Sequence, residues 1–111
     1  MVNPPFFPLF LFPFSNLLAS DYERTLPVYN GTVISTNYNN PGAPTYVVVG
    51  TGGNREGNSD PSTIPKRPPA WSVSHLENIG FGLFYLTNTT LDWTFIDANT
   101  NTVLDQFTMS K

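Results

Sequence analysis

The clearest hydrophobic pattern lies near the C-terminal end, where Leu91, Trp93 and Phe95 alternate with Asp92 and Thr94. Side chains of a β-strand point alternately to its two faces, so this spacing predicts a strand with one buried face. Turn-rich segments and further β-prone runs flank it. The pattern predicts three antiparallel strands: Gly82–Thr87, Leu91–Ile96 and Val103–Met109.

A second apolar run, Thr45–Val49, breaks abruptly into glycines at positions 50, 52, 53 and 57. This composition predicts a buried strand that feeds a tight loop. The valines, Val47–Val49, are apolar on both faces of such a strand, which predicts cover from layers on both sides. No stretch reads as an amphipathic helix that could supply this cover, so we expect the isolated chain to self-associate.

The segment on the N-terminal side of Thr45–Val49 is predicted to form a hairpin. Two short β-prone runs, Thr25–Tyr29 and Thr32–Thr36, flank Asn30-Gly31, a dipeptide typical of a type I′ turn. Asn37–Pro44 reads as a loop. The stretch Trp71–Asn78 has no clean period, and both a helical turn and an extended segment remain open.

The first twenty residues, Met1–Ser20, form an apolar leader that we separate from a domain over 21–111. Its core, Phe6–Phe14, is interrupted by two prolines and is too short to cross a bilayer as a helix. It has the length of a signal-peptide core, yet no Lys or Arg precedes it and no A-x-A-like site lies near Ala19. A secretory signal and a wrongly joined N-terminus both remain open.

Charge and cysteine content exclude several classes of protein. The chain has 111 residues, of which 12% are charged, and a net charge of −3. The pair Lys66–Arg67 is the largest basic cluster, so nucleic-acid binding is not expected. Cysteine is absent, which excludes disulfides and thiolate sites.

The glycine loop does not match either common phosphate-binding motif. Gly52 and Gly57 have the spacing of a P-loop, but Asn58 and Ser59 follow them where a Lys and a Ser or Thr are required. A dinucleotide fingerprint would need a third glycine at Arg55, and the prolines after the loop forbid the helix that must follow. A phosphate cradle is therefore not predicted.

No catalytic residue can be assigned from the remaining polar positions. His75 is the chain's one histidine, and we interpret it as a surface or hydrogen-bonded residue. No periodicity brings Glu56 and Glu77 together as an acid–base pair. Ser72 and Ser74 lie too close to His75 in sequence to form a triad with it.

Several separate blocks resemble the C-terminal part of purple acid phosphatases between Tyr22 and Met109. The most telling are Tyr22-Glu23-Arg24 and Gly52-Gly53-Asn54-Arg55-Glu56; the others are Trp71-Ser72, Gly80-Phe81-Gly82 and the late Asp105-Gln106-Phe107. The resemblance implies a mainly β segment comprising the C-terminal antiparallel strands and loops of a layered α/β metallophosphoesterase sandwich. It also implies phosphate-monoester hydrolysis at a dinuclear metal centre, and a secreted or extracellular protein.

The same resemblance implies that the metal site is incomplete. In the family a G-H-x-H-x block with two metal-binding histidines precedes the Tyr-Glu-Arg triplet, whereas Leu18 and Ser20 stand at these positions here. The other ligand blocks have no counterpart in the chain. We therefore predict no metal ligand or cofactor, an inactive chain, and an upstream catalytic half as its partner. The alternative is a non-catalytic β-rich structural or interaction module.

The motif arginines and two sequons complete the candidate residues. Arg24 and Arg55 could contact phosphate, but we favour a role in tying loops, through carbonyls or through Glu23 and Glu56. Sequons at Asn30 and Asn88 lie in predicted turns, which makes both asparagines candidate glycosylation sites.

Overall fold

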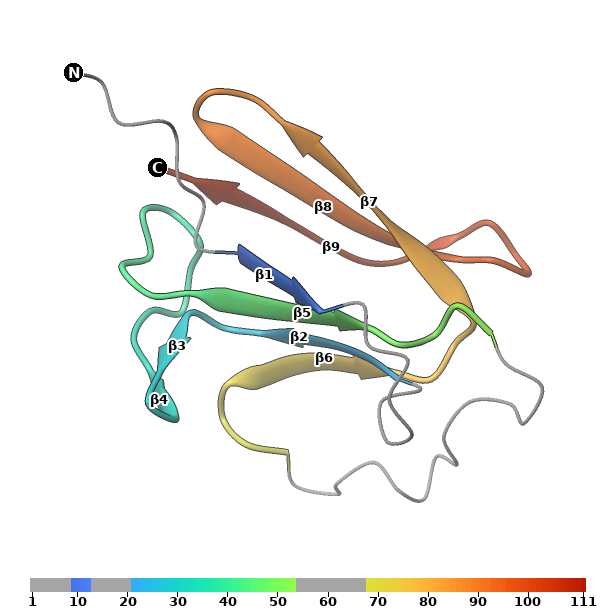
Figure 1. Cartoon of the computed structure of the whole chain (residues 1–111), viewed down its shortest axis with the longest axis horizontal. Coiled ribbons are helices and arrows are strands. Elements are labelled where there is room, and N and C mark those ends of the chain that lie inside the picture. Colours follow the sequence, from blue (N-terminus) through green and yellow to red (C-terminus); the bar gives the residue numbers. More distant parts are fainter. Residues whose placement is uncertain (1–8, 13–20, 54–67) are drawn as a thin grey trace.

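Two β-sheets face each other in this computed structural model, and a short hairpin lies beside them (Figure 1). The structure describes residues 9–12, 21–53 and 68–111. Its strands are β1 (Leu9–Phe12), β2 (Tyr22–Thr25), β3 (Val28–Tyr29), β4 (Thr32–Val33), β5 (Thr45–Val49), β6 (Ser72–Leu76), β7 (Gly80–Leu86), β8 (Thr90–Asp97) and β9 (Val103–Ser110). The described residues include no helix, and hence no helix that could span a membrane.

The four-stranded sheet has the order β1-β5-β2-β6. Strand β2 is antiparallel to both neighbours, and Tyr22 lies opposite Val49 of β5 and Leu76 of β6. Strand β1 pairs with β5 in parallel over four residues. Part of the segment that we set apart as a leader therefore adds an edge strand to this sheet.

The three-stranded sheet has the order β7-β8-β9, with antiparallel pairs throughout. Alternate residues of β8 are buried, so the alternation read from the sequence is confirmed, with Leu91 3%, Trp93 2% and Phe95 0% exposed. The three predicted C-terminal strands are also confirmed, and β7 begins two residues earlier than expected.

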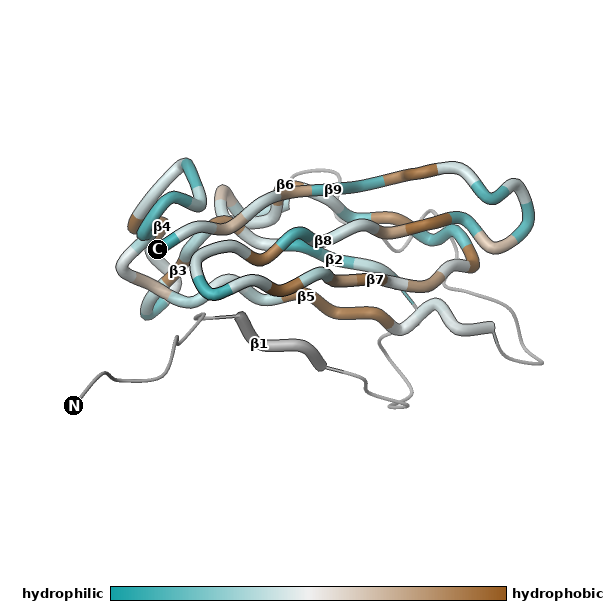
Figure 2. The backbone as a smooth tube through the Cα atoms, turned by 90° about the horizontal axis from the view of Figure 1, so that it is seen from above, coloured by the Kyte–Doolittle hydropathy of each residue, from teal (hydrophilic) through white to brown (hydrophobic). Residues whose placement is uncertain are grey.

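The core lies between the two sheets. It combines Tyr22 and Val47 of the four-stranded sheet with Leu91, Trp93, Phe95 and Met109 of the three-stranded sheet. Burying each large apolar side chain contributes about 1.5–3 kcal/mol. Strand β5 has the predicted bounds, and its valines stand out as a brown stretch in Figure 2. The chain's own second sheet thus covers the inner face of β5, which the sequence pattern did not predict.

The hairpin β3–β4 turns at Asn30-Gly31, whose φ angles of 47° and 74° give the predicted positive-φ pair of a type I′ turn. The expectation of one strand from Thr25 to Tyr29 is wrong, because β2 ends at Thr25 and β3 starts at Val28. Pro27 lies between them, and a proline has no N–H for a sheet ladder.

Two further segments differ from the expectation or complete it. Strand β2 was not predicted, since Tyr22–Thr25 contains two charged residues and only one aromatic side chain. The stretch Trp71–Asn78, left open in the sequence, is extended and forms β6. Its strand identity comes from pairing with β2, which supplies hydrogen bonds that the local sequence does not specify.

Candidate functional site

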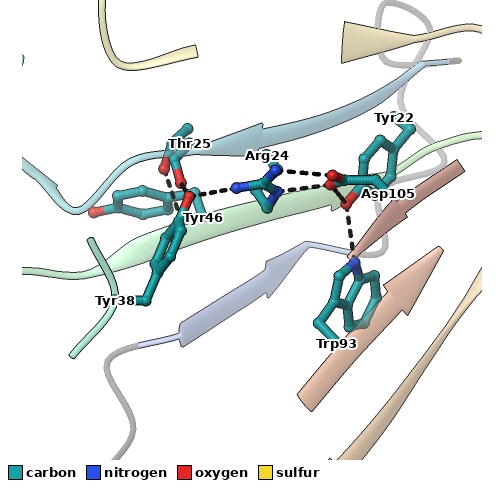
Figure 3. A network of polar contacts seen from close by, with 7 residues as sticks. All are labelled: Tyr22, Arg24, Thr25, Tyr38, Tyr46, Trp93 and Asp105. Atoms are coloured by element: carbon teal, nitrogen blue, oxygen red, sulfur yellow. Dashed lines mark hydrogen bonds and ion pairs between the residues drawn. The ribbon is translucent and has the colours of Figure 1, made fainter. Parts of the chain in front are cut away.

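The main polar cluster of the described residues is an ion pair that joins the two sheets (Figure 3). Arg24 of β2 meets Asp105 of β9 with Nε 2.6 Å from Oδ2 and Nη2 2.8 Å from Oδ1. The two side chains are 13% and 10% exposed. A two-pronged contact of this kind between planar groups fixes their orientation as well as their distance.

Two aromatic side chains extend this cluster. The Tyr22 hydroxyl donates a hydrogen bond to Asp105 Oδ2 at 2.6 Å and accepts one from Trp93 Nε1 at 2.9 Å. The Tyr22 ring stacks on Phe95, with ring centroids 4.0 Å apart. The Asp105 carboxylate therefore accepts hydrogen bonds from Arg24 and Tyr22, and every polar atom of the buried Tyr22–Trp93 pair has a partner.

Tyr38 closes the cluster on the other side of Arg24. Arg24 Nη1 donates to the Tyr38 hydroxyl, which donates to the carbonyl oxygen of Thr25 at 3.0 Å. The guanidinium carbon lies 5.6 Å from the Tyr38 ring centroid and 5.2 Å from that of Phe107. Arg24 thus has aromatic rings near its π-face and acceptors along its edge, which suits a partly desolvated guanidinium.

Within this cluster the surroundings shift three pKa values. Burial raises the pKa of Tyr22 well above its usual range, and the hydrogen bond to the Asp105 carboxylate raises it further. Burial alone would lower the pKa of Arg24, but the contacts with Asp105 and Tyr38 outweigh it and raise that pKa. Burial also raises the pKa of Tyr38. Around neutral pH the cluster holds two neutral phenols and one cation.

This arrangement can stabilise the fold but is poorly suited to bind phosphate. Each guanidinium nitrogen of Arg24 has an acceptor inside the protein. The structure gives Arg24 a tying role, but it joins two sheets and not loops, and its partners are Asp105 and Tyr38 in place of carbonyls or Glu23. Arg55 lies outside the described residues.

A smaller polar row lies on the opposite face of β2, because neighbouring residues of a strand alternate in direction. Glu23 Oε1 accepts a hydrogen bond from Ser72 Oγ at 2.7 Å, and His75 Nε2 lies 3.1 Å from Asp21 Oδ2. His75 is hydrogen-bonded, as interpreted from the sequence. The Ser72 hydroxyl is directed to Glu23, so these contacts form no Ser-His pair.

The family-motif segments meet at one edge of the sandwich. The Gly50 N–H donates to the Asp21 carbonyl, and the Gly80 N–H donates to the Thr51 carbonyl, both at 3.0 Å. These bonds bring together the start of β2, the end of β5 and the start of β7. Gly52 and Gly53 lie in this turn, where Gly53 has a φ of 91° that favours glycine.

Several predicted site positions cannot be placed at this edge. Leu18, Ser20, Asn54, Arg55 and Glu56 all lie outside the described residues. The structure therefore does not test whether Glu56 pairs with Glu77.

The donor set in the described ranges does not fit a dinuclear metal centre. No group of three or more His, Cys, Asp or Glu side chains within 9–12, 21–53 and 68–111 could hold a metal ion. A two-metal site needs a dense cluster of such donors. Asp21 and His75 provide one carboxylate and one imidazole.

Residues 43–106 match the family model of "Iron/zinc purple acid phosphatase-like protein C". The chain belongs to this family. A comparison with curated proteins gave no match. Among solved structures, the chain is similar to purple acid phosphatase PPD1 from yellow lupin (Lupinus luteus) seeds, with a TM-score of 0.70 and 26% identity. The match covers 84% of this chain and 16% of the lupin chain.

Membership of the purple acid phosphatase-like family confirms the resemblance read from the motif blocks, and with it the β-rich C-terminal fold. Three members of the polar cluster, Tyr38, Trp93 and Asp105, were not predicted from the sequence as site residues. Asp105 had been noted as part of the Asp-Gln-Phe block, but the sequence carries no signal that it faces Arg24. That contact depends on how the two sheets are stacked.

Proposed function

We propose that this chain is the C-terminal portion of a purple acid phosphatase-like phosphomonoester hydrolase, and that it has no phosphatase activity alone. The observation that carries the proposal is the use of Tyr22 and Arg24, two residues of the family's Tyr-Glu-Arg triplet, to join the sheets. In this chain the triplet links the two sheets, close to the edge of the sandwich where the motif segments meet. The metal ligands and the reacting groups would come from an upstream catalytic half.

Leu18 and Ser20 support the absence of activity. They stand where the resemblance places two metal-binding histidines, and neither an alkyl group nor a hydroxyl replaces an imidazole as a ligand. When bound, a dinuclear metal centre would supply Lewis-acid activation of the phosphate and a water nucleophile. This chain's own contribution would be to hold Asp21 and the turn Thr51–Gly53 at the edge of the sandwich.

An activity assay tests this proposal. The purified chain, incubated with iron, zinc or manganese salts, is expected to retain no stoichiometric metal and to leave an aryl phosphate intact at acid pH. A variant with Leu18→His and Ser20→His serves as a control and is also expected to be inactive, since two imidazoles do not complete a two-metal site. Acid hydrolysis by the unaltered chain, with bound metal, would overturn the proposal.

We further propose that the chain enters the secretory route and carries glycans at Asn30 and Asn88. Both asparagines are exposed in turns, Asn30 between β3 and β4 and Asn88 between β7 and β8. In material secreted from eukaryotic cells, Asn30→Gln and Asn88→Gln should each lower the mass by one glycan. A secreted chain whose mass is unchanged by endoglycosidase would contradict this.

One observation favours a second function, that of a non-catalytic β-rich module. Both sides of the core come from this chain, and none of its side chains Trp93, Tyr22, Phe95, Met109 and Val47 is more than 2% exposed. A module should unfold cooperatively on heating without any added partner. A chain that folds only when the upstream half is supplied would favour the role of an enzyme fragment.

A further inference from the structure

Strand β7 forms an open edge that is apolar on both of its faces. Along it, Phe81 is 43% exposed, Leu83 55%, Phe84 53%, Tyr85 69% and Leu86 50%. In the described part of the chain β7 pairs with β8 alone, and Figure 1 shows it at the outer side of its sheet. Parts of β7 are brown in Figure 2, which marks hydrophobic residues along this strand.

The backbone groups that face this open edge can be identified from the neighbouring hydrogen bonds. Ile79 and Thr87 bond to Ala98 and Thr90, so odd-numbered residues of β7 direct their backbone groups toward β8. The Gly80 N–H bonds to Thr51 on the other side, in keeping with this alternation. The backbone N–H and C=O groups of Gly82, Phe84 and Leu86 therefore face outward.

Strand β7 lacks the features that usually protect an edge from pairing. Its sequence, GFGLFYL, has no proline and no charged residue. Its register with β8 runs from Gly80 to Leu86 without a bulge. Proteins commonly use charges, prolines and bulges to block edge-to-edge pairing, so their absence leaves β7 able to accept another strand.

We propose that the partner strand is β7 of a second copy of this chain, antiparallel and with Leu83 on the two-fold axis. The sequence is self-complementary about Leu83: in this register Phe81 lies opposite Tyr85, and Gly82 lies opposite Phe84. Gly80 then lies opposite Leu86. In this register Gly82 of each chain forms a hydrogen-bonded pair with Phe84 of the other chain. This agrees with the open edge, where the backbone groups of these even-numbered residues face outward.

The small-against-large pairing has a physical basis in the structure. A Cβ at Gly82 would lie 2.0 Å from Cη2 of Trp93, so the indole ring lies across this glycine. Phe84 of the same chain already stacks near Trp93, with ring centroids 6.4 Å apart. Opposite Gly82, the partner's Phe84 would extend this row of aromatic rings, an arrangement known to stabilise glycine positions in sheets.

Charge also favours a second copy. Each chain carries a net charge of −3, but β7 itself is uncharged, so two-fold pairing places no like charges directly opposite each other. In the two-fold dimer the β7 edges of both chains are paired with each other, so assembly through this edge ends at two copies. The inference concerns this chain alone and does not depend on the proposed phosphatase function.

Single cysteines test the register, since the chain has no cysteine of its own. Leu83→Cys places two thiols opposite each other in a non-hydrogen-bonded pair, where Cα atoms are about 4.5 Å apart and a disulfide can form. Tyr85→Cys is the matched control on the same face, because the residue opposite it is Phe81. Under mild oxidation Leu83→Cys should become a covalent dimer at least tenfold faster than Tyr85→Cys, and mixing Phe81→Cys with Tyr85→Cys should restore cross-linking.

Sedimentation of the whole chain tests the assembly. The unaltered chain should reach twice its mass of 12.3 kDa as its concentration rises. Leu83→Lys should remain monomeric, since it places two ammonium groups on the axis, whereas Thr94→Lys, on the same face of β8, should still dimerise. Circular dichroism checks that both variants are folded. A chain that stays monomeric at every concentration would overturn the proposal and indicate a different partner for this edge. Open-ended aggregation, or equal cross-linking rates at positions 83 and 85, would also overturn it.

Discussion

Strands β7 and β8 are neighbours in one sheet, yet their aromatic residues lie in opposite environments. Phe95 of β8 is 0% exposed, whereas Phe84 of β7, on the same inner face, is 53% exposed. Both strands are rich in aromatic and aliphatic residues. Hydrophobic composition therefore does not decide burial here. What decides it is whether the strand lies at the centre of its sheet with another sheet stacked on it.

Strand β8 has both advantages, because β7 and β9 flank it and the four-stranded sheet covers its inner face. Strand β7 has a neighbour on one side, and the inner-face residues Phe84 and Leu86 stay half exposed. The contrast predicts that equivalent substitutions on the two strands have very different energetic effects.

The largest effect is expected from Phe95→Ala on β8. Truncating a fully buried phenylalanine removes its transfer free energy and leaves a cavity, so it should lower the free energy of unfolding by about 3–5 kcal/mol. The change Phe81→Ala on the outer face of β7, where the side chain is 43% exposed, should cost less than about 1 kcal/mol when measured below the concentration of association. Urea denaturation measures both, and equal losses would remove the contrast between the strands.

A slightly smaller loss is expected from Gly82→Ala, at one of two glycines, with Gly80, where β7 is packed tightly against its neighbours. The added methyl group would meet the Trp93 ring at 2.0 Å, and overpacking of this kind costs about 3 kcal/mol. Gly52→Ala is the control, since a Cβ there meets nothing within 4 Å and no positive φ is required. Thermal unfolding should separate the two variants clearly, and a Gly82→Ala protein as stable as the control would contradict this packing.

The inner face of β9 provides the next test. Asp105→Asn removes the charge that Arg24 and Tyr22 share, and a partly buried cation left without its counter-ion should cost about 2 kcal/mol. Asp92→Asn, on the outer face, affects an exposed hydrogen bond from Thr108 and should change the free energy of unfolding by less than about 0.5 kcal/mol. Chemical denaturation of both variants checks the difference.

The smallest expected effect is a loss of stability at alkaline pH that comes from the interior tyrosines. The pKa of Tyr22 is raised in the folded state, so its contribution is fully present below the unfolded value of about 10 and is lost as pH rises above it. Tyr38 acts in the same direction. Tyr22→Phe should reduce the alkaline loss by about 1 kcal/mol per pH unit. The unaltered chain is the reference, and an identical alkaline slope for Tyr22→Phe would count against the assigned environment of Tyr22.

Local patterns in the sequence determined much of the strand layout. The alternation of Leu91, Trp93 and Phe95 fixes which face of β8 is buried, because a strand has a strict two-residue period. Asn30-Gly31 determines the β3–β4 turn, because few residues adopt two successive positive φ angles at low cost. The motif blocks between Tyr22 and Met109 identified the family, since the order and spacing of these blocks can be read without knowledge of the tertiary contacts.

Tertiary structure alone decided the rest. Arg24 and Asp105 are 81 positions apart in the chain, and they meet only because β2 and β9 lie on facing sheets. Strands β2 and β6 carry weak local signals and become strands through pairing with each other. The exposure of β7 likewise follows from its place at a sheet edge. Sequence periodicity records which way a side chain points along one strand, whereas contacts between strands depend on register and stacking, which no single segment contains.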